Sequence, residues 1–117
     1  MVDPAHLVGA GGALGALLRH LVAEFVDREA FPLGTVAVNV LGTFALGLVT
    51  FAGAGEGTLL LVGIGACGSF TTFSSFSVDA VRLWEDGERT KAIGYAVGTL
   101  VAAGVALGAA WLLARGL

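Results

Sequence analysis

Polar side chains recur at helical spacing inside stretches of the chain that are otherwise apolar. Thr35, Asn39 and Thr43 follow one another four residues apart. Tyr95 and Thr99 show the same spacing, and residues four apart lie on one face of a helix. Their hydroxyl and amide groups can donate hydrogen bonds, and none of them carries a negative charge. Such a row of donors can replace the hydration shell of an anion.

Hydroxyl groups and aromatic rings come together in residues 68–77. Phe73 and Phe76 are three residues apart and would share a helix face, with Thr72 and Ser75 on an adjacent one. Because the edge of a phenyl ring carries positive potential, two ring edges could solvate a small anion without holding it tightly. Backbone carbonyls at the end of a broken helix would suit a hard cation instead.

The same polar residues could also serve only to hold helices together. Interhelical hydrogen bonds in membranes contribute roughly 0.6 kcal/mol each. We prefer this interpretation for Thr43 and Thr50. For Asn39, deep in its apolar stretch, the residues alone favour neither interpretation.

The elements that must carry these groups are membrane-spanning helices. No Asp, Glu, Lys or Arg occurs in residues 30–55, 57–78 or 92–114, and a helix crosses a bilayer in about 20 residues. The chain is 56% hydrophobic and 13% charged, against about 25% charged in soluble domains. We therefore predict an all-α, multi-pass membrane protein with one domain, residues 1–117, and four spans at about 4–26, 32–52, 58–83 and 92–114.

The third span carries the signals of a break near its middle. Gly63, Gly65 and Gly68 precede a Ser-Phe-Thr-Thr run; glycine is a poor helix former, and Ser and Thr favour helix starts. We predict a break near residues 68–71 and a second short helix beyond it. Irregular backbone at membrane depth usually marks a binding element. A continuous but kinked helix is the alternative.

Composition and length exclude several classes of function. The chain has no room for a soluble catalytic domain, and a net charge of −3 without a basic tail gives no reason to expect nucleic acid as a partner. Cys67 is the single cysteine, and we interpret it as a packing residue. His6 and His20 have no cysteine or carboxylate at ligand spacing, so no metal site is expected there. Residues 1–6 lack the positive region of a signal peptide.

Three motifs resemble those of one family, the Fluc or CrcB fluoride channels. Residues 11–19, GGALGALLR, resemble the family's GGxxGAxxR, and residues 34–42, GTVAVNVLG, resemble its GTxxVNxxG. Residues 68–77, GSFTTFSSFS, resemble its highly specific GxxTTFSTFS. The resemblance covers the whole chain in order. It implies a fluoride-selective channel of the cell membrane that exports fluoride passively, built as an antiparallel dimer with two pores and surrounded by membrane lipid.

By this resemblance, Phe73 and Phe76 would be the ring-edge ligands of fluoride, and Asn39 would line the pore and orient a phenylalanine. Arg19 would lie near the pore vestibule. The full set that the resemblance assigns to the pore is Arg19, Asn39, Phe73, Ser74, Ser75, Phe76, Tyr95 and Thr99.

The resemblance also implies one structural Na⁺ on the dimer axis, which is not transported. The backbone carbonyls of Gly68 and Thr71 from both subunits would hold it. This chain departs from the family at Ala103, where a hydroxyl residue often continues the polar track. The track therefore need not extend beyond Thr99.

Three rival functions fit the residues less well. A small four-helix multidrug exporter would need a membrane-embedded glutamate, and the nearest candidate in the first span is Glu24, beside a loop. An enzyme would need a nucleophile with its base, or a cluster of ligands. A purely structural membrane subunit would leave the Thr-Thr-Phe-Ser-Ser-Phe run unexplained.

The positive charges predict a preferred orientation in the membrane. On the side of the membrane that holds both termini, Arg115 is the single Lys or Arg residue. Positive residues favour the cytoplasmic side. We therefore predict that both termini lie outside. An antiparallel dimer would then need either a second copy inserted the other way or a paired homologous subunit, and both stay open. The opposite side holds Arg28, Arg82, Arg89 and Lys91, with Arg19 nearby.

Overall fold

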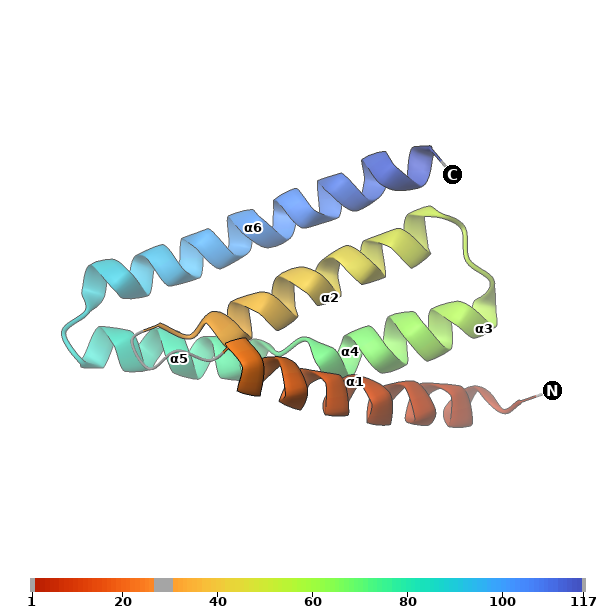
Figure 1. The fold of residues 1–117 in the computed structure, drawn as a ribbon, viewed down its shortest axis with the longest axis horizontal. Coiled ribbons are helices and arrows are strands. Elements are labelled where there is room, and N and C mark those ends of the chain that lie inside the picture. The colour runs from red at the N-terminus through yellow and green to blue at the C-terminus, as the bar shows by residue number, and fades with distance from the viewer. Residues whose placement is uncertain (1, 27–30, 117) are drawn as a thin grey trace.

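Four long helical segments make up the computed structural model, which describes residues 2–26 and 31–116. They lie side by side, and the first begins at the end of the bundle where the last finishes (Figure 1). Each is long and apolar enough to cross a membrane: Pro4–Val26, Leu33–Phe51, Glu56–Glu85 and Arg89–Arg115. This confirms the prediction of an all-α protein with four membrane-spanning helices. Arg28, counted above for orientation, lies outside the described residues.

Three of the four spans are continuous α-helices: α1 (Pro4–Val26), α2 (Leu33–Phe51) and α6 (Arg89–Arg115). Proline stands only where a helix tolerates it. Pro4 is the first residue of α1, and Pro32 directly precedes α2. At these positions the missing N–H has no intrahelical partner to lose.

The third span is assembled from shorter pieces. They are α3 (Glu56–Thr58), the π-helix η1 (Leu59–Cys67), α4 (Gly68–Phe70) and α5 (Phe73–Glu85). Between α4 and α5 the backbone is extended, with ψ of 160° at Thr71 and 119° at Thr72. The Thr72 hydroxyl oxygen accepts a hydrogen bond from the Ser75 N–H at 3.1 Å. This cap satisfies one of the free N–H groups at the start of α5.

Glycines bring α1 unusually close to η1. Gly11 of α1 and Gly65 of η1 are both buried. A Cβ atom added to Gly11 would overlap the carbonyl oxygen of Leu61, and one added to Gly65 would lie 2.7 Å from the carbonyl oxygen of Val8. Small residues of this kind let helix backbones approach in membranes. The close crossing fixes α1 on the third span, where it packs against η1 and α4.

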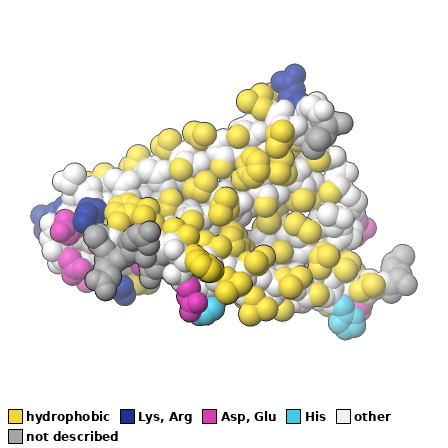
Figure 2. Space-filling model, viewed as in Figure 1, with side chains coloured by type: hydrophobic (Ala, Val, Ile, Leu, Met, Phe, Trp, Pro, Cys, Tyr) yellow, Lys and Arg dark blue, Asp and Glu magenta, His cyan; other side chains and the backbone are white. Residues whose placement is uncertain are grey.

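The outer surface of the bundle is apolar in its middle. Figure 2 shows hydrophobic side chains over the centre of the visible face and most charged side chains toward its ends. On α6 the large exposed side chains include Leu100, which is 74% exposed, and Val105, which is 66% exposed. Such a continuous apolar surface suits contact with lipid rather than water.

Replacing Gly11 by alanine should destabilise the fold, because the added Cβ would clash with the backbone of Leu61. Helical backbone cannot move away as a flexible side chain can. Overpacking of this kind costs about 1–3 kcal/mol of folding free energy. We expect the Gly11→Ala variant, purified in detergent, to unfold at a clearly lower temperature than the wild type.

Gly9→Ala is the matched control, since Gly9 lies in the same helix with nothing within 4 Å of an added Cβ. Alanine is the better helix former, so this variant should unfold at or above the wild-type midpoint. Equal midpoints for the two variants would contradict the close crossing of α1 and η1.

Candidate functional site

One side chain of α2 holds the extended residues of the third span. The Asn39 Nδ2 group donates to the Thr72 carbonyl oxygen at 3.0 Å, and the Thr72 N–H donates to Asn39 Oδ1 at 2.7 Å. Both backbone groups of Thr72 are therefore paired where no helix pairs them. A buried backbone group left unpaired costs about 1–3 kcal/mol, and lipid offers no water to replace the partner. Asn39 thus stabilises the extended backbone directly before Phe73.

A glycine lets α2 approach this point closely. Gly42 is buried, and a Cβ added to it would overlap the Thr71 Cγ2 methyl group. The Thr71 hydroxyl donates to the Cys67 carbonyl oxygen at 2.9 Å, which ties the extended segment back to η1. Thr43 donates within its own helix, to the Asn39 carbonyl oxygen at 2.6 Å. The polar row on α2 is therefore not uniform, since Asn39 reaches across and Thr43 does not.

Aromatic rings of α5 and α6 form a row beyond the extended residues. The Phe73 and Phe76 ring centroids are 5.9 Å apart, and those of Phe76 and Tyr95 are 5.2 Å apart. Phe73 is 80% exposed, whereas Tyr95 is 1% exposed. The row of rings therefore runs from the exposed Phe73 at the start of α5 to the buried Tyr95 on α6.

Asp79 brings a carboxylate onto the polar face, which corrects the expectation that this face carries no negative charge. Its Oδ2 atom accepts hydrogen bonds from the Thr35 hydroxyl at 2.9 Å and from the Tyr95 hydroxyl at 3.4 Å. The predicted third span, about 58–83, already includes Asp79, but the polar face was predicted from hydroxyl, amide and aromatic residues alone. The spacing of three residues from Phe76, which places both on one helix face, was the signal that could have found it.

A cavity of about 310 Å³ lies between α1, α2 and α5. Arg19 lines it and brings a positively charged guanidinium group to the cavity. Thr35, Thr72 and Ser75 line it as well, so hydroxyl groups and a fixed positive charge meet in one hollow. Such a hollow attracts anions. The first span therefore reaches the polar residues of α2 and α5 through Arg19.

Two further hydroxyl groups have distinct surroundings. Ser74 Oγ lies 3.3 Å from the Thr72 hydroxyl, next to the helix cap. Thr99 Oγ1 is buried without a hydrogen-bond partner among the described residues. A buried hydroxyl costs free energy until it finds an acceptor. Thr99 therefore has a hydroxyl donor on α6 that no described residue uses.

The residues proposed for a cation lie at the open side of the extended segment. Gly68 and Thr71 line a second cavity, of about 530 Å³, together with Asn39 and Phe73. Gly68 is exposed, and nothing lies within 4 Å of a Cβ built on it. Among residues 2–26 and 31–116, no group of three His, Cys, Asp or Glu could hold a metal ion. A cation here would therefore depend on backbone oxygens.

Comparison with known proteins connects these features to one group of channels. Residues 6–112 match the family described as CrcB-like protein, Camphor Resistance (CrcB). The chain is 61% identical over 114 residues to the fluoride-specific ion channel FluC 2 of Haloarcula marismortui, covering 97% of this chain and 96% of that protein. It is 53% identical over 113 residues to the fluoride-specific ion channel FluC 1 of Halobacterium salinarum, covering 97% and 95%. It is 45% identical over 107 residues to the fluoride-specific ion channel FluC 2 of Rhodococcus jostii, covering 91% of each.

Replacing Asn39 by alanine should leave both backbone groups of Thr72 without partners. We expect a loss of about 1–3 kcal/mol for each unpaired group, seen as a lower unfolding temperature in detergent. Amide hydrogen exchange at Thr72 should also become faster than in the wild type.

Thr43→Val is the matched control, one turn along the same helix, because the Thr43 hydroxyl bonds only within α2. This variant should keep the wild-type midpoint and exchange rate. A drop of the same size in both variants would show that the Asn39–Thr72 pair is not the stabilising contact.

Proposed function

The chain belongs to the CrcB family, and on this premise we propose that it is a fluoride-selective ion channel of the cell membrane. It lets fluoride leave the cell passively and so lowers the toxicity of fluoride in the cytoplasm. The observation that carries the proposal is 61% identity, over 97% of the chain, to a protein named as a fluoride-specific ion channel. The chain is accordingly not an enzyme, and the multidrug-exporter and structural-subunit hypotheses are set aside.

We infer that the edges of Phe73 and Phe76 are the fluoride-binding element. Their ring centroids lie 5.9 Å apart, and Phe73 is 80% exposed at the start of α5. Ring edges attract an anion through their positive potential but carry no full charge. An ion bound in this way can also leave, as conduction requires.

Hydroxyl and amide groups would replace the hydration shell of the fluoride ion on either side of the rings. Asn39 acts by holding Thr72, and so directs the neighbouring Phe73. The Thr99 hydroxyl, which has no hydrogen-bond partner among residues 2–26 and 31–116, supports a path along α6. Arg19 would concentrate fluoride in the adjoining cavity. The remaining donors of the proposed path are Ser74, Ser75 and Tyr95.

Asp79 has a defined part in this path. Its Oδ2 atom accepts hydrogen bonds from the hydroxyl groups of Thr35 and Tyr95, which partly offset its charge. An anion that reaches these hydroxyls must compete with the carboxylate for the same hydrogens. We infer that this competition limits how tightly fluoride is held here.

We propose that the working channel is an antiparallel dimer, in which the third helix stays broken at Thr71 and Thr72. Support comes from the start of α5, where Phe73, Ser74 and Ser75 are all exposed on the isolated chain. Exposed hydroxyls and an extended backbone are costly against lipid. A second subunit laid over this side would cover them.

The backbone carbonyls of Gly68 and Thr71 would hold a structural Na⁺ in that dimer. These residues fit the ion, because neutral carbonyl oxygens suit hard cations and the extended Thr71 turns its carbonyl away from the helical ladder. One chain offers too few oxygens for a complete shell, so a partner would supply the rest. The ion would contribute charge neutralisation between the subunits and would not be transported.

Replacing Phe73 or Phe76 by isoleucine should reduce fluoride conduction, because the side chain keeps its apolar bulk and loses the ring edge. We expect fluoride efflux from liposomes, followed with a fluoride electrode, to fall by about tenfold. Phe51→Ile serves as the control, since Phe51 is 43% exposed at the far end of α2.

Wild-type efflux in both variants would show that the two rings only pack. If the wild-type chain gives no efflux, either alone or co-expressed with a homologous subunit, the channel proposal itself is wrong.

Withdrawal of Na⁺ should weaken the dimer. We expect the purified protein to unfold at a lower temperature, or to dissociate, when Na⁺ is replaced by a large organic cation that the carbonyl site cannot accommodate. Efflux should fall with the loss of the dimer. Stability and efflux that are both indifferent to the exchange would count against the site.

A reporter fused to the C-terminus should sit outside the cytoplasm, following the positive-charge count. Arg115 stands alone on the side of the termini, against four or five positive residues opposite. A single orientation would favour a paired homologous subunit as the partner. Equal signals from both locations would instead favour two copies of this chain in opposite orientations.

A further inference from the structure

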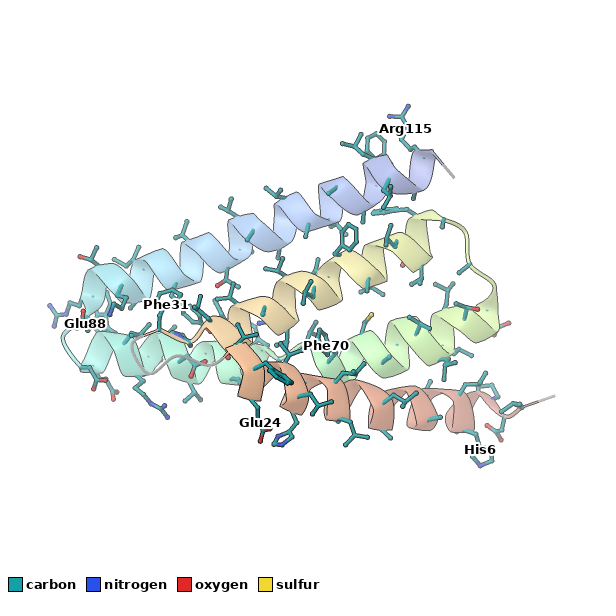
Figure 3. The ribbon with its side chains drawn as sticks, viewed as in Figure 1. His6, Glu24, Phe31, Phe70, Glu88 and Arg115 are labelled. Carbon is teal, nitrogen blue, oxygen red and sulfur yellow. The ribbon has the colours of Figure 1, made fainter. Side chains whose placement is uncertain are left out.

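A fourth aromatic ring extends the row formed by Phe73, Phe76 and Tyr95. The Phe31 ring lies 5.6 Å from the Tyr95 ring between centroids, at an interplanar angle of 83°. This edge-to-face arrangement is a favoured geometry for aromatic pairs. Phe31 lies beside the start of α2, two residues before the helix begins (Figure 3). It belongs to none of the polar sets that define the proposed path.

Tyr95 is held by rings from two different elements. Phe76 of α5 contacts it in a tilted arrangement at 5.2 Å and 33°, while Phe31 contacts it edge-to-face. Tyr95 is only 1% exposed, so no open space is left into which its ring could turn. The two aromatic contacts therefore fix the plane of the Tyr95 ring.

The hydrogen bond of Tyr95 is too long to fix the ring by itself. The Tyr95 hydroxyl lies 3.4 Å from Asp79 Oδ2, whereas Thr35 reaches the same atom at 2.9 Å. Hydroxyl hydrogen bonds are usually about 2.5–3.0 Å long. Thr35 thus holds the carboxylate firmly, and the aim of the Tyr95 hydroxyl depends mainly on how its ring is packed.

We propose that Phe31 is a positioning residue for fluoride conduction that acts through Tyr95. This inference rests on the proposed channel function. Phe31 keeps the Tyr95 ring beside Phe76 and its hydroxyl directed at the fluoride path. Without a ring at position 31, the Tyr95 ring can rotate. Its hydroxyl then no longer donates a hydrogen bond to the fluoride ion that moves on from Phe76.

The test compares Phe31→Leu with Phe31→Tyr in the liposome efflux assay. The leucine variant should lose about two- to tenfold of the fluoride efflux, since that is the range expected from one aromatic pair. The tyrosine variant keeps the ring and should stay close to the wild type. Phe25→Leu is the matched control, because Phe25 is 83% exposed on α1, and its efflux should not change.

A double variant separates positioning from simple packing. If Phe31 acts through the Tyr95 hydroxyl, Phe31→Leu should reduce efflux little further when Tyr95→Phe is already present. The inference would be overturned if Phe31→Leu reduced efflux by the same factor with and without Tyr95→Phe. It would also be overturned if the Phe31→Leu channel kept wild-type efflux. Should Phe31→Leu not fold, Phe31→Met takes its place with the same expectations. Efflux absent from the wild type would refute the channel function instead, so the two failures remain distinguishable.

Discussion

Thr72 has two backbone polar groups that no helix satisfies, and Asn39 binds both of them. In the interior of a membrane these groups have no water to turn to. If Asn39 released them, the chain could satisfy them only by continuing as a helix. Each residue of a helix is rotated by about 100° from the last, so Phe73 and the hydroxyls after it would then point elsewhere. The positions of the proposed ligands therefore depend on one amide side chain.

The second constraint is how closely the helices approach. Gly42 admits the Thr71 methyl group, and Gly11 and Gly65 admit backbone oxygens. Side chains at these positions would separate α2 and α1 from the third span. Asn39 would then fall short of Thr72, and Arg19 would move away from Ser75 in the shared cavity. These glycines therefore matter because the absence of a side chain lets the neighbouring helices approach closely.

Much of the architecture could be predicted because charge-free stretches and four-residue spacings are properties of the sequence itself. The Asn39–Thr72 pairing could not, since the partner of Asn39 is a backbone group 33 residues away. The sequence predicted the break near residues 68–71; Gly68 is helical in α4, and the extended residues are Thr71 and Thr72. The π-helix η1 was not expected, because glycine content alone does not select a helix type. Asp79 lies inside the predicted third span, but it was missed because its partners Thr35 and Tyr95 are on other helices.

We infer that a row of ring edges and hydroxyl donors, held by Asn39, conducts fluoride in preference to other halides. The most direct measurement is the reversal potential of the reconstituted wild-type protein in a planar bilayer, with fluoride on one side and chloride on the other. We expect a current that reverses close to the limit set by the fluoride gradient. A reversal potential near zero, showing that chloride passes as readily as fluoride, would contradict it.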